Sequence, residues 1–234
     1  MLSRTHLEPH PALTYDRPFR TLFEDGILLL LASERSEDSD ESNSLARGSI
    51  AFTMMLPEVA ANICIESLHL DSSVFNEMDK LSPLAKFDYF LKCRFRKRQI
   101  SSGMLPVQKL QELKRLRDSF VHPKRFQVHW KPALAKDGSY LGESKRTQFL
   151  DMSSNPTMWY DEDAVRAMRG AHEFLAHFFR DLCKMPKGKA TNLLFSDEAL
   201  LGEEGIRVFH YGRPFHEALR RWKIDTSYFR IGVL

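Results

Sequence analysis

Cysteine is scarce in this sequence of 234 residues. The three that occur are widely spaced, and no Cys-x-x-Cys pair is present: they are Cys64, Cys93 and Cys183. An odd and dispersed set argues against a disulfide framework and against a zinc site built from cysteine pairs. Cys64 and Cys183 have apolar neighbours, so we expect buried thiols in a reducing compartment.

Long apolar runs are missing as well. Residues 27–32 are far fewer than the roughly 20 apolar residues that a membrane helix needs. The longer run 50–65 is interrupted by Pro57, Glu58 and Asn62. The first 18 residues contain no apolar stretch of the kind found in a signal peptide. We therefore expect a cytoplasmic protein without a membrane span.

The usual signatures of cofactor and metal sites are also absent. The sequence contains no Gly-x-Gly-x-x-Gly, no Gly-x-x-x-x-Gly-Lys and no Gly-x-Ser-x-Gly. His172 and His177 lie five residues apart, which is about 140° around a helix, whereas a shared zinc face needs a spacing of four. We predict no cofactor and no metal, and we expect both histidines on a helix surface.

Helical patterns dominate what is present. Apolar residues recur at three- and four-residue steps, which predicts an all-α fold. Residues 45–69 are apolar nearly all round and so indicate a central helix, in which Pro57 should cause a kink or remove a backbone hydrogen bond. The helices are expected at residues 19–34, 45–69, 79–97, 106–122 and 161–184.

Irregular segments flank and separate these helices. Residues 1–18 are predicted to be an irregular arm, and the acidic, serine-rich residues 33–44 a mobile loop. Residues 126–160 form a long insertion after the fourth helix, with a short hairpin. Residues 185–234 are expected to be a mixed extension packed on the helical domain of residues 19–184. Within this extension the sequence indicates short strands at 193–195 and 206–209 and helical turns at 216–222.

The fourth helix ends in a chemically distinctive segment, Arg-Asp-Ser-Phe-Val-His-Pro, that begins at Arg117. Pro123 disfavours helical geometry in the residue before it, so His122 need not follow the helical register. Its imidazole could then turn back toward Arg117 and Asp118. The plainer interpretation is a histidine that caps the helix beside a surface ion pair of little energetic weight.

This segment resembles the Arg-x4-6-His signature of the HEPN superfamily, small helical domains that often act as ribonucleases. A polar residue commonly follows the arginine in that pattern, as Asp118 does here. Glu58 and Asn62 on the apolar helix resemble the family's Glu-x3-Asn region. The order of helices over about residues 20–184 also fits. The resemblance implies an HEPN-like up-and-down helical bundle that works as a homodimer.

The resemblance further implies metal-independent RNA cleavage in a cleft to which both protomers contribute. Arg117 would hold phosphate oxygens, and His122 would move protons to or from the 2′-hydroxyl and the leaving group. Asp118 would orient one of these groups, with Glu58 and Asn62 supporting them from behind.

Basic residues surround the motif, and the formal charge of +3 permits an anionic partner. We expect phosphate contacts from Lys114, Arg115, Lys124, Arg125, Arg94 and Arg96. A solvated helix face would carry the same charges.

One hypothesis is an endoribonuclease with a toxin, antiphage or stress-response role and an antitoxin protein as partner. The alternative is a catalytically silent HEPN-like protein that binds RNA, a nucleotide or a protein. A third, weaker interpretation is a helical protein whose motif only caps a helix.

Overall fold

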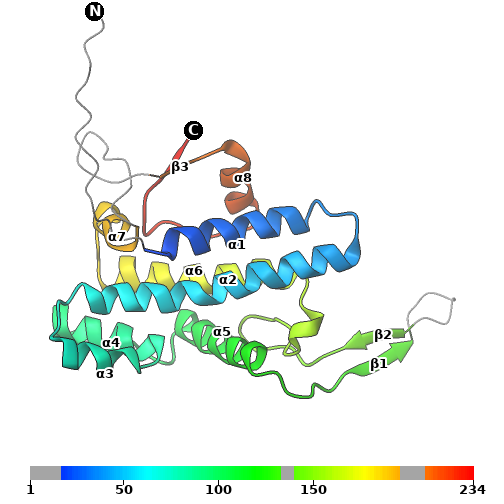
Figure 1. Cartoon of the computed structure of the whole chain (residues 1–234), viewed down its shortest axis with the longest axis horizontal. Coiled ribbons are helices and arrows are strands. Elements are labelled where there is room, and N and C mark those ends of the chain that lie inside the picture. The colour runs from blue at the N-terminus through cyan, green and yellow to red at the C-terminus, as the bar shows by residue number, and fades with distance from the viewer. Residues whose placement is uncertain (1–16, 133–139, 196–208) are drawn as a thin grey trace, which may run out of the picture.

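The computed structural model describes residues 17–132, 140–195 and 209–234, and these are mostly helical (Figure 1). The α-helices are α1 (Phe19–Ser33), α2 (Ser39–Glu66), α3 (Ser72–Asp79), α4 (Pro83–Arg94), α5 (Leu105–Val121), α6 (Asp161–Ala176), α7 (Lys187–Leu194) and α8 (Arg213–Arg221). A 3-10 turn, η1 (Pro156–Met158), precedes α6, and α6 continues into a π-helical stretch, η2 (His177–Leu182). Strand β1 (His129–Pro132) pairs antiparallel with β2 (Tyr140–Glu143), and β3 (Phe209–Tyr211) pairs parallel with β4 (Ile231–Val233).

Helix α2 is the centre of the fold and packs against α1, α4, α5 and α6. In Figure 1, α1 lies along one side of α2 and α6, and α3, α4 and α5 lie along the other. Among the described residues α2 alone has the length and composition of a membrane span. However, 61% of its most apolar window is buried inside the fold, because apolar side chains occupy several of its faces.

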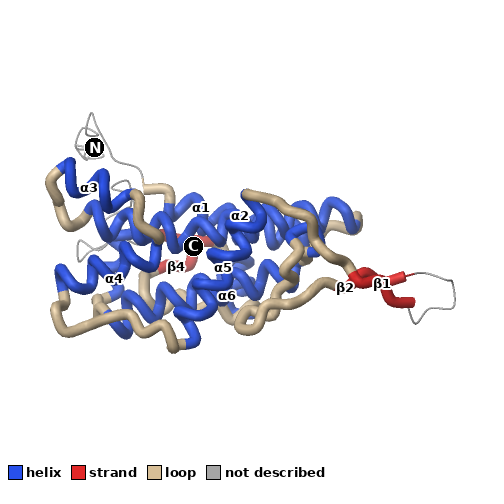
Figure 2. Tube along the Cα trace, turned by 90° about the horizontal axis from the view of Figure 1, so that it is seen from below, coloured by secondary structure: helices blue, strands red, loops and turns tan. Residues whose placement is uncertain are grey.

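The C-terminal segment completes the same hydrophobic core. Phe215, Trp222, Tyr228 and Phe229 are buried in one cluster with Phe23 of α1. Buried aromatic side chains of this size each stabilise a fold by about 1.5–3 kcal/mol relative to exposure. The antiparallel hairpin of β1 and β2 instead projects from one end of the helical body (Figures 1 and 2).

The expected helices 19–34 and 106–122 match α1 and α5 to within one residue at each end. The predicted loop 33–44 is wrong in its second half, because α2 begins at Ser39. The Asp38 carboxylate accepts hydrogen bonds from the backbone N–H groups of Asp40 and Glu41, both at 2.8 Å, and so caps the helix. Pro57 lies inside the continuous helix α2, where it provides no backbone donor.

The helix expected over 79–97 is present as α4 but is shorter at both ends, and the separate helix α3, which ends at Asp79, was not predicted. Ser82 caps α4, and a proline in the first helical position cannot continue a preceding helix. The helix expected over 161–184 is α6 followed by η2. The wider turn of η2 is marked by a 2.8 Å bond from the Cys183 N–H to the Phe178 carbonyl, five residues back.

The hairpin expected within 126–160 is present as β1 and β2, and the helical turns expected at 216–222 belong to α8. The strand expected at 193–195 is wrong, because Leu193 and Leu194 form the last turn of α7. Residues 206–208 of the other expected strand and residues 1–16 of the expected arm lie outside the described residues.

Candidate functional site

Arg117 of α5 and Glu58 of α2 meet across the interface between the two helices. Arg117 Nη1 donates a hydrogen bond to Glu58 Oε2, although the two residues are 59 positions apart in the chain. Arg117 Nε and Nη2 both donate to Asp118 Oδ1, at 3.2 Å and 2.9 Å. The Arg117 side chain remains 27% exposed. Two carboxylates therefore fix the guanidinium at the edge of solvent.

Asp118 links the pair to a second cation. Lys114 Nζ lies 2.7 Å from Asp118 Oδ2, one helical turn earlier on α5. Burial alone would raise the pKa of Asp118, but hydrogen bonds from Lys114 and Arg117 outweigh it and lower that pKa below its ordinary value. Asp118 is therefore ionised at neutral pH, and two cations balance two carboxylates in this cluster.

His122 ends α5 and departs from helical geometry. Its backbone angles are φ −119° and ψ 70°, and its N–H still donates to the Asp118 carbonyl at 3.0 Å. The side chain is exposed and makes no hydrogen bond or ion pair with any residue that the structure describes. The imidazole therefore does not turn back onto Arg117 or Asp118. Five residues correspond to about 7.5 Å along a helix axis and about 140° around it, so Arg117 and His122 do not share one face of α5.

Asn62 does not join this cluster. Its Oδ1 accepts a hydrogen bond of 2.6 Å from Lys86 Nζ, which also lies 3.2 Å from Asp79 Oδ1. Lys86 is almost fully buried on α4. Asn62 lies one turn beyond Glu58 on α2, where the neighbouring elements are α3 and α4 rather than α5. The sequence reveals no local signal for Lys86, because its burial follows from the packing of three helices.

The expected phosphate-binding residues divide into two groups. Arg94 Nη2 donates to the Ser67 carbonyl at 2.8 Å and ties the end of α4 to the end of α2. The others have exposed side chains. The side chains of Arg96, Lys124 and Arg125 make no hydrogen bond or ion pair with a described residue, whereas Lys114 is paired with Asp118. Arg115 Nε donates to the Gln111 carbonyl at 3.4 Å, and its Nη2 lies 3.9 Å from Glu112 Oε1.

A hollow surface flanks the other side of α5. Arg115 and Ser119 line a pocket of about 550 Å³ against residues 145–149. Lys145 and Ser154 also line a second pocket, of about 640 Å³, beside the hairpin. Ser119 follows Arg117 by two residues, or about 200° around the helix, so these pockets and the Arg117 cluster occupy different faces of α5.

Glu112 builds the wall of the first pocket, and the sequence did not single it out. Its buried carboxylate accepts backbone hydrogen bonds from Gln148, Phe149 and Leu150 at 2.9, 3.0 and 2.8 Å. The sequence does contain a signal, because Glu112 is an acidic residue on the apolar side of α5. A carboxylate buried there requires several hydrogen-bond donors from elsewhere in the chain.

No protein-family model, curated protein or solved structure matches this chain. Membership of the HEPN superfamily therefore stays a prediction that rests on the motif residues.

Both histidines were expected on a helix surface, which is wrong for His172, because it is buried, while His177 is partly buried. His172 is fully buried, and its Nδ1 lies 3.1 Å from the Tyr228 hydroxyl. His177 is 12% exposed, with Nδ1 3.5 Å from Asp181 Oδ2. The C-terminal segment covers His172, which a local helical pattern does not reveal. Among the described residues no group of three or more His, Cys, Asp or Glu side chains is placed to hold a metal ion.

Proposed function

We propose that this protein is a metal-independent endoribonuclease of HEPN type, in which Arg117 and His122 act on the phosphodiester. The contact between Arg117 and Glu58 carries the proposal. The resemblance rests on the Arg-x4-6-His pattern at Arg117 and the Glu-x3-Asn pattern at Glu58. These two residues are 59 positions apart in the sequence, and their charged side chains are in contact. The mainly helical fold around a long central apolar helix is compatible with an HEPN-like bundle.

The proposed reaction needs a positive charge to stabilise the phosphorane-like transition state and a group that transfers a proton. The RNA 2′-oxygen attacks phosphorus, the bond from phosphorus to the 5′-oxygen breaks, and a 2′,3′-cyclic phosphate and a 5′-hydroxyl result. Arg117 stabilises the charge that gathers on the non-bridging oxygens. His122 takes the proton of the 2′-hydroxyl or delivers one to the 5′-oxygen, which its exposed position permits.

The charge balance of the cluster favours a homodimer. Glu58 and Asp118 neutralise Arg117 and Lys114 within one protomer, so a phosphate gains little net attraction there. A second copy of the chain would add its own Arg117 and His122 to a shared cleft. Lys124 and Arg125 beside His122, whose side chains have no partner among the described residues, would hold the RNA backbone together with Arg96.

We place this activity in the cytoplasm, in a toxin, antiphage or stress-response role with an antitoxin protein as partner. One observation favours the alternative of a catalytically silent RNA-, nucleotide- or protein-binding relative. The Arg117 guanidinium is already held by two carboxylates, and the His122 side chain has no described group to orient it.

Substitution of the two motif residues separates these functions. We expect Arg117→Gln and His122→Asn each to lower the rate of RNA cleavage in EDTA by about 100-fold or more, the usual cost of losing a charge stabiliser or general acid–base group. Gel electrophoresis of a labelled RNA measures the rate, and thermal unfolding checks the fold.

Matched controls use exposed residues distant in sequence from the motif. Arg35→Gln removes an exposed arginine, and His69→Asn removes an exposed histidine. His69 has φ 52°, a conformation that asparagine tolerates. Both controls should cleave like wild type. If wild type binds RNA without cutting it, the silent alternative holds. If both motif variants still cut at the wild-type rate, the proposed site is wrong.

A further inference from the structure

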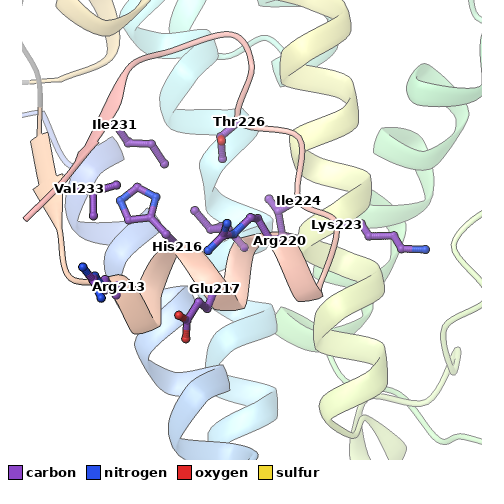
Figure 3. A pocket seen from close by; sticks show the side chains of 10 residues that line it. Arg213, His216, Glu217, Arg220, Lys223, Ile224, Thr226, Ile231 and Val233 are labelled. Carbon is purple, nitrogen blue, oxygen red and sulfur yellow. The ribbon is translucent and has the colours of Figure 1, made fainter.

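A separate pocket of about 610 Å³ lies between α8, the loop that follows it and strand β4 (Figure 3). Four of its lining residues are arginine, lysine or histidine: Arg213, His216, Arg220 and Lys223. No lining residue belongs to α2 or α5, so this pocket is independent of the Arg117 cluster.

The sequence of α8 separates its two faces cleanly. Arg213, His216 and Arg220 recur at steps of three and four residues and therefore share one side of the helix. Phe215, Ala218 and Leu219 are buried, together with Trp222 just beyond the helix end. The buried side anchors the helix to the core, and the basic side is left to face the pocket. Arg213 and Arg220 are about 10.5 Å apart along the axis.

The positive charge of this pocket is not neutralised by the described part of the chain. The side chains of Arg213, Arg220 and Lys223 make no hydrogen bond or ion pair with any described residue. Nearby arginines are different, because Arg221 pairs with Glu34 and Arg180 pairs with Asp225. Of the lining residues only Glu217 is acidic; it lies one helical turn from Arg213 and from Arg220 without forming an ion pair among the described residues, and Figure 3 shows its carboxylate directed away from His216 and Thr226.

His216 and β4 form a fixed wall. His216 Nε2 lies 2.8 Å from the Gly232 carbonyl, which can only accept, so Nε2 carries the proton and Nδ1 is not used in this bond. A Cβ atom on Gly232 would lie 2.4 Å from the His210 ring, so glycine lets strand β4 pass this ring without displacing it. In Figure 3, His216 and Arg220 project from α8 toward Ile231 and Thr226.

Apart from Glu217 and Thr226, the rest of the lining is apolar. Leu219 and Ile224 are buried, and Ile231 is partly buried beside them. Ligand pockets of roughly 300–1,000 Å³ commonly combine such an apolar surface with a few charged groups. A guanidinium group can donate two parallel hydrogen bonds to two oxygens of one phosphate. A carboxylate beside it would repel that phosphate.

We propose that this pocket binds a small phosphate-bearing ligand of nucleotide size. Arg220, with His216 beside it, holds the phosphate, Lys223 and Arg213 add charge at the two ends, and the apolar residues contact the organic part. The proposal does not depend on RNA cleavage.

Calorimetric titration of the full chain tests it, with AMP, inorganic phosphate and adenosine as probes. We expect saturable binding of AMP, weaker binding of phosphate and none of adenosine. Arg220→Gln should weaken AMP binding by about tenfold or more, as expected when a charge-assisted hydrogen bond to phosphate is lost. Arg35→Gln, an exposed arginine outside the pocket, should leave it unchanged.

Arg220 is exposed, so its substitution should leave the thermal unfolding temperature unaltered, and equal unfolding of the variants verifies this. The absence of AMP and phosphate binding up to about 10 mM, an affinity too weak to be specific, would overturn the proposal. So would AMP binding that Arg220→Gln leaves intact. Arg220-dependent binding of a short RNA but not of AMP would also overturn it. The Arg117→Gln and His122→Asn variants should bind AMP like wild type, which separates this result from the ribonuclease test.

Discussion

Arg117 is the residue on which the proposed chemistry depends, and its surroundings restrict what it can do. Glu58 and Asp118 hold the guanidinium in one orientation, which reduces the entropy lost when a phosphate binds. The same carboxylates compete with that phosphate. These pairs are partly exposed, and ion pairs at the surface contribute only about 0–1 kcal/mol, so a charged substrate can displace them.

His172 is a buried histidine whose ionisation opposes folding. Burial lowers its pKa to about 3, although the charge of Asp225 partly offsets this effect. Its Nδ1 is next to the Tyr228 hydroxyl, and its Nε2 has no hydrogen-bond partner among the described residues. The neutral ring is therefore the folded form at all pH values above about 3.

This burial predicts a pH-dependent stability. Below pH 6.5 the unfolded chain binds a proton that folded His172 rejects, so the free energy of unfolding falls as pH drops from 6.5 toward 3. The slope is about 1.4 kcal/mol per pH unit. We expect His172→Gln to remove this contribution, measured as the difference in slope between variant and wild type in urea unfolding at pH 7, 6 and 5. Parallel slopes for the two proteins would contradict it.

At the scale of elements, one helix positions a long loop. The Glu112 carboxylate on α5 accepts three consecutive backbone N–H groups from residues 148–150. This contact holds the segment between β2 and α6 against α5, and with it the pocket that Arg115 and Ser119 line. Gly170 of α6 lies at the same junction, where a side chain would meet Leu150 at 2.4 Å.

Removal of this carboxylate should therefore release the loop. We expect Glu112→Ala to lower the free energy of unfolding by about 2–4 kcal/mol, because three donors lose a charged acceptor and part of that loss is recovered by water. Glu37→Ala, an exposed glutamate without a described partner, should change it by less than about 0.5 kcal/mol. Urea unfolding measures both, and equal values for the two variants would show that Glu112 does not anchor the loop.

Element boundaries could be predicted where local chemistry decides them. Helix α5 has regular leucines and prolines at both ends, and its limits were predicted within one residue. Helix α2 begins earlier than predicted because low apolar content in residues 39–44 concealed a favourable Asp38 cap. Ser82 and Pro83 indicated that α4 begins at this point, because they are typical of a helix start. The prediction of a helix from residue 79 instead followed the apolar periodicity across 79–97.

The site could be predicted only in part, for reasons of packing. Glu58 and Arg117 were both singled out, and they meet. Asn62 was grouped with them through the family resemblance, but its hydrogen-bond partner is the buried Lys86. The helical spacing of Arg213, His216 and Arg220 was a signal available in the sequence, although the wall opposite them comes from the last strand and is not local.

The molecule as a whole is one core to which distant segments contribute. Arg17 donates to the Leu193 carbonyl at 2.6 Å, and Trp222 Nε1 donates to Glu34 at 2.7 Å, so both ends of the described chain are tied to helices far away in sequence. This arrangement buries α2 and leaves the Arg117 end of α5 and the basic side of α8 as separate surfaces.

Ribonuclease activity at Arg117 and His122 is the central claim, and one measurement tests it most directly. Purified wild-type protein in EDTA is incubated with a labelled RNA and with the same strand carrying 2′-deoxyribose at every position. The proposed attack by the 2′-oxygen predicts cleavage of the RNA alone, with 2′,3′-cyclic phosphate ends. An intact RNA, or equal cleavage of the deoxy strand, would contradict it.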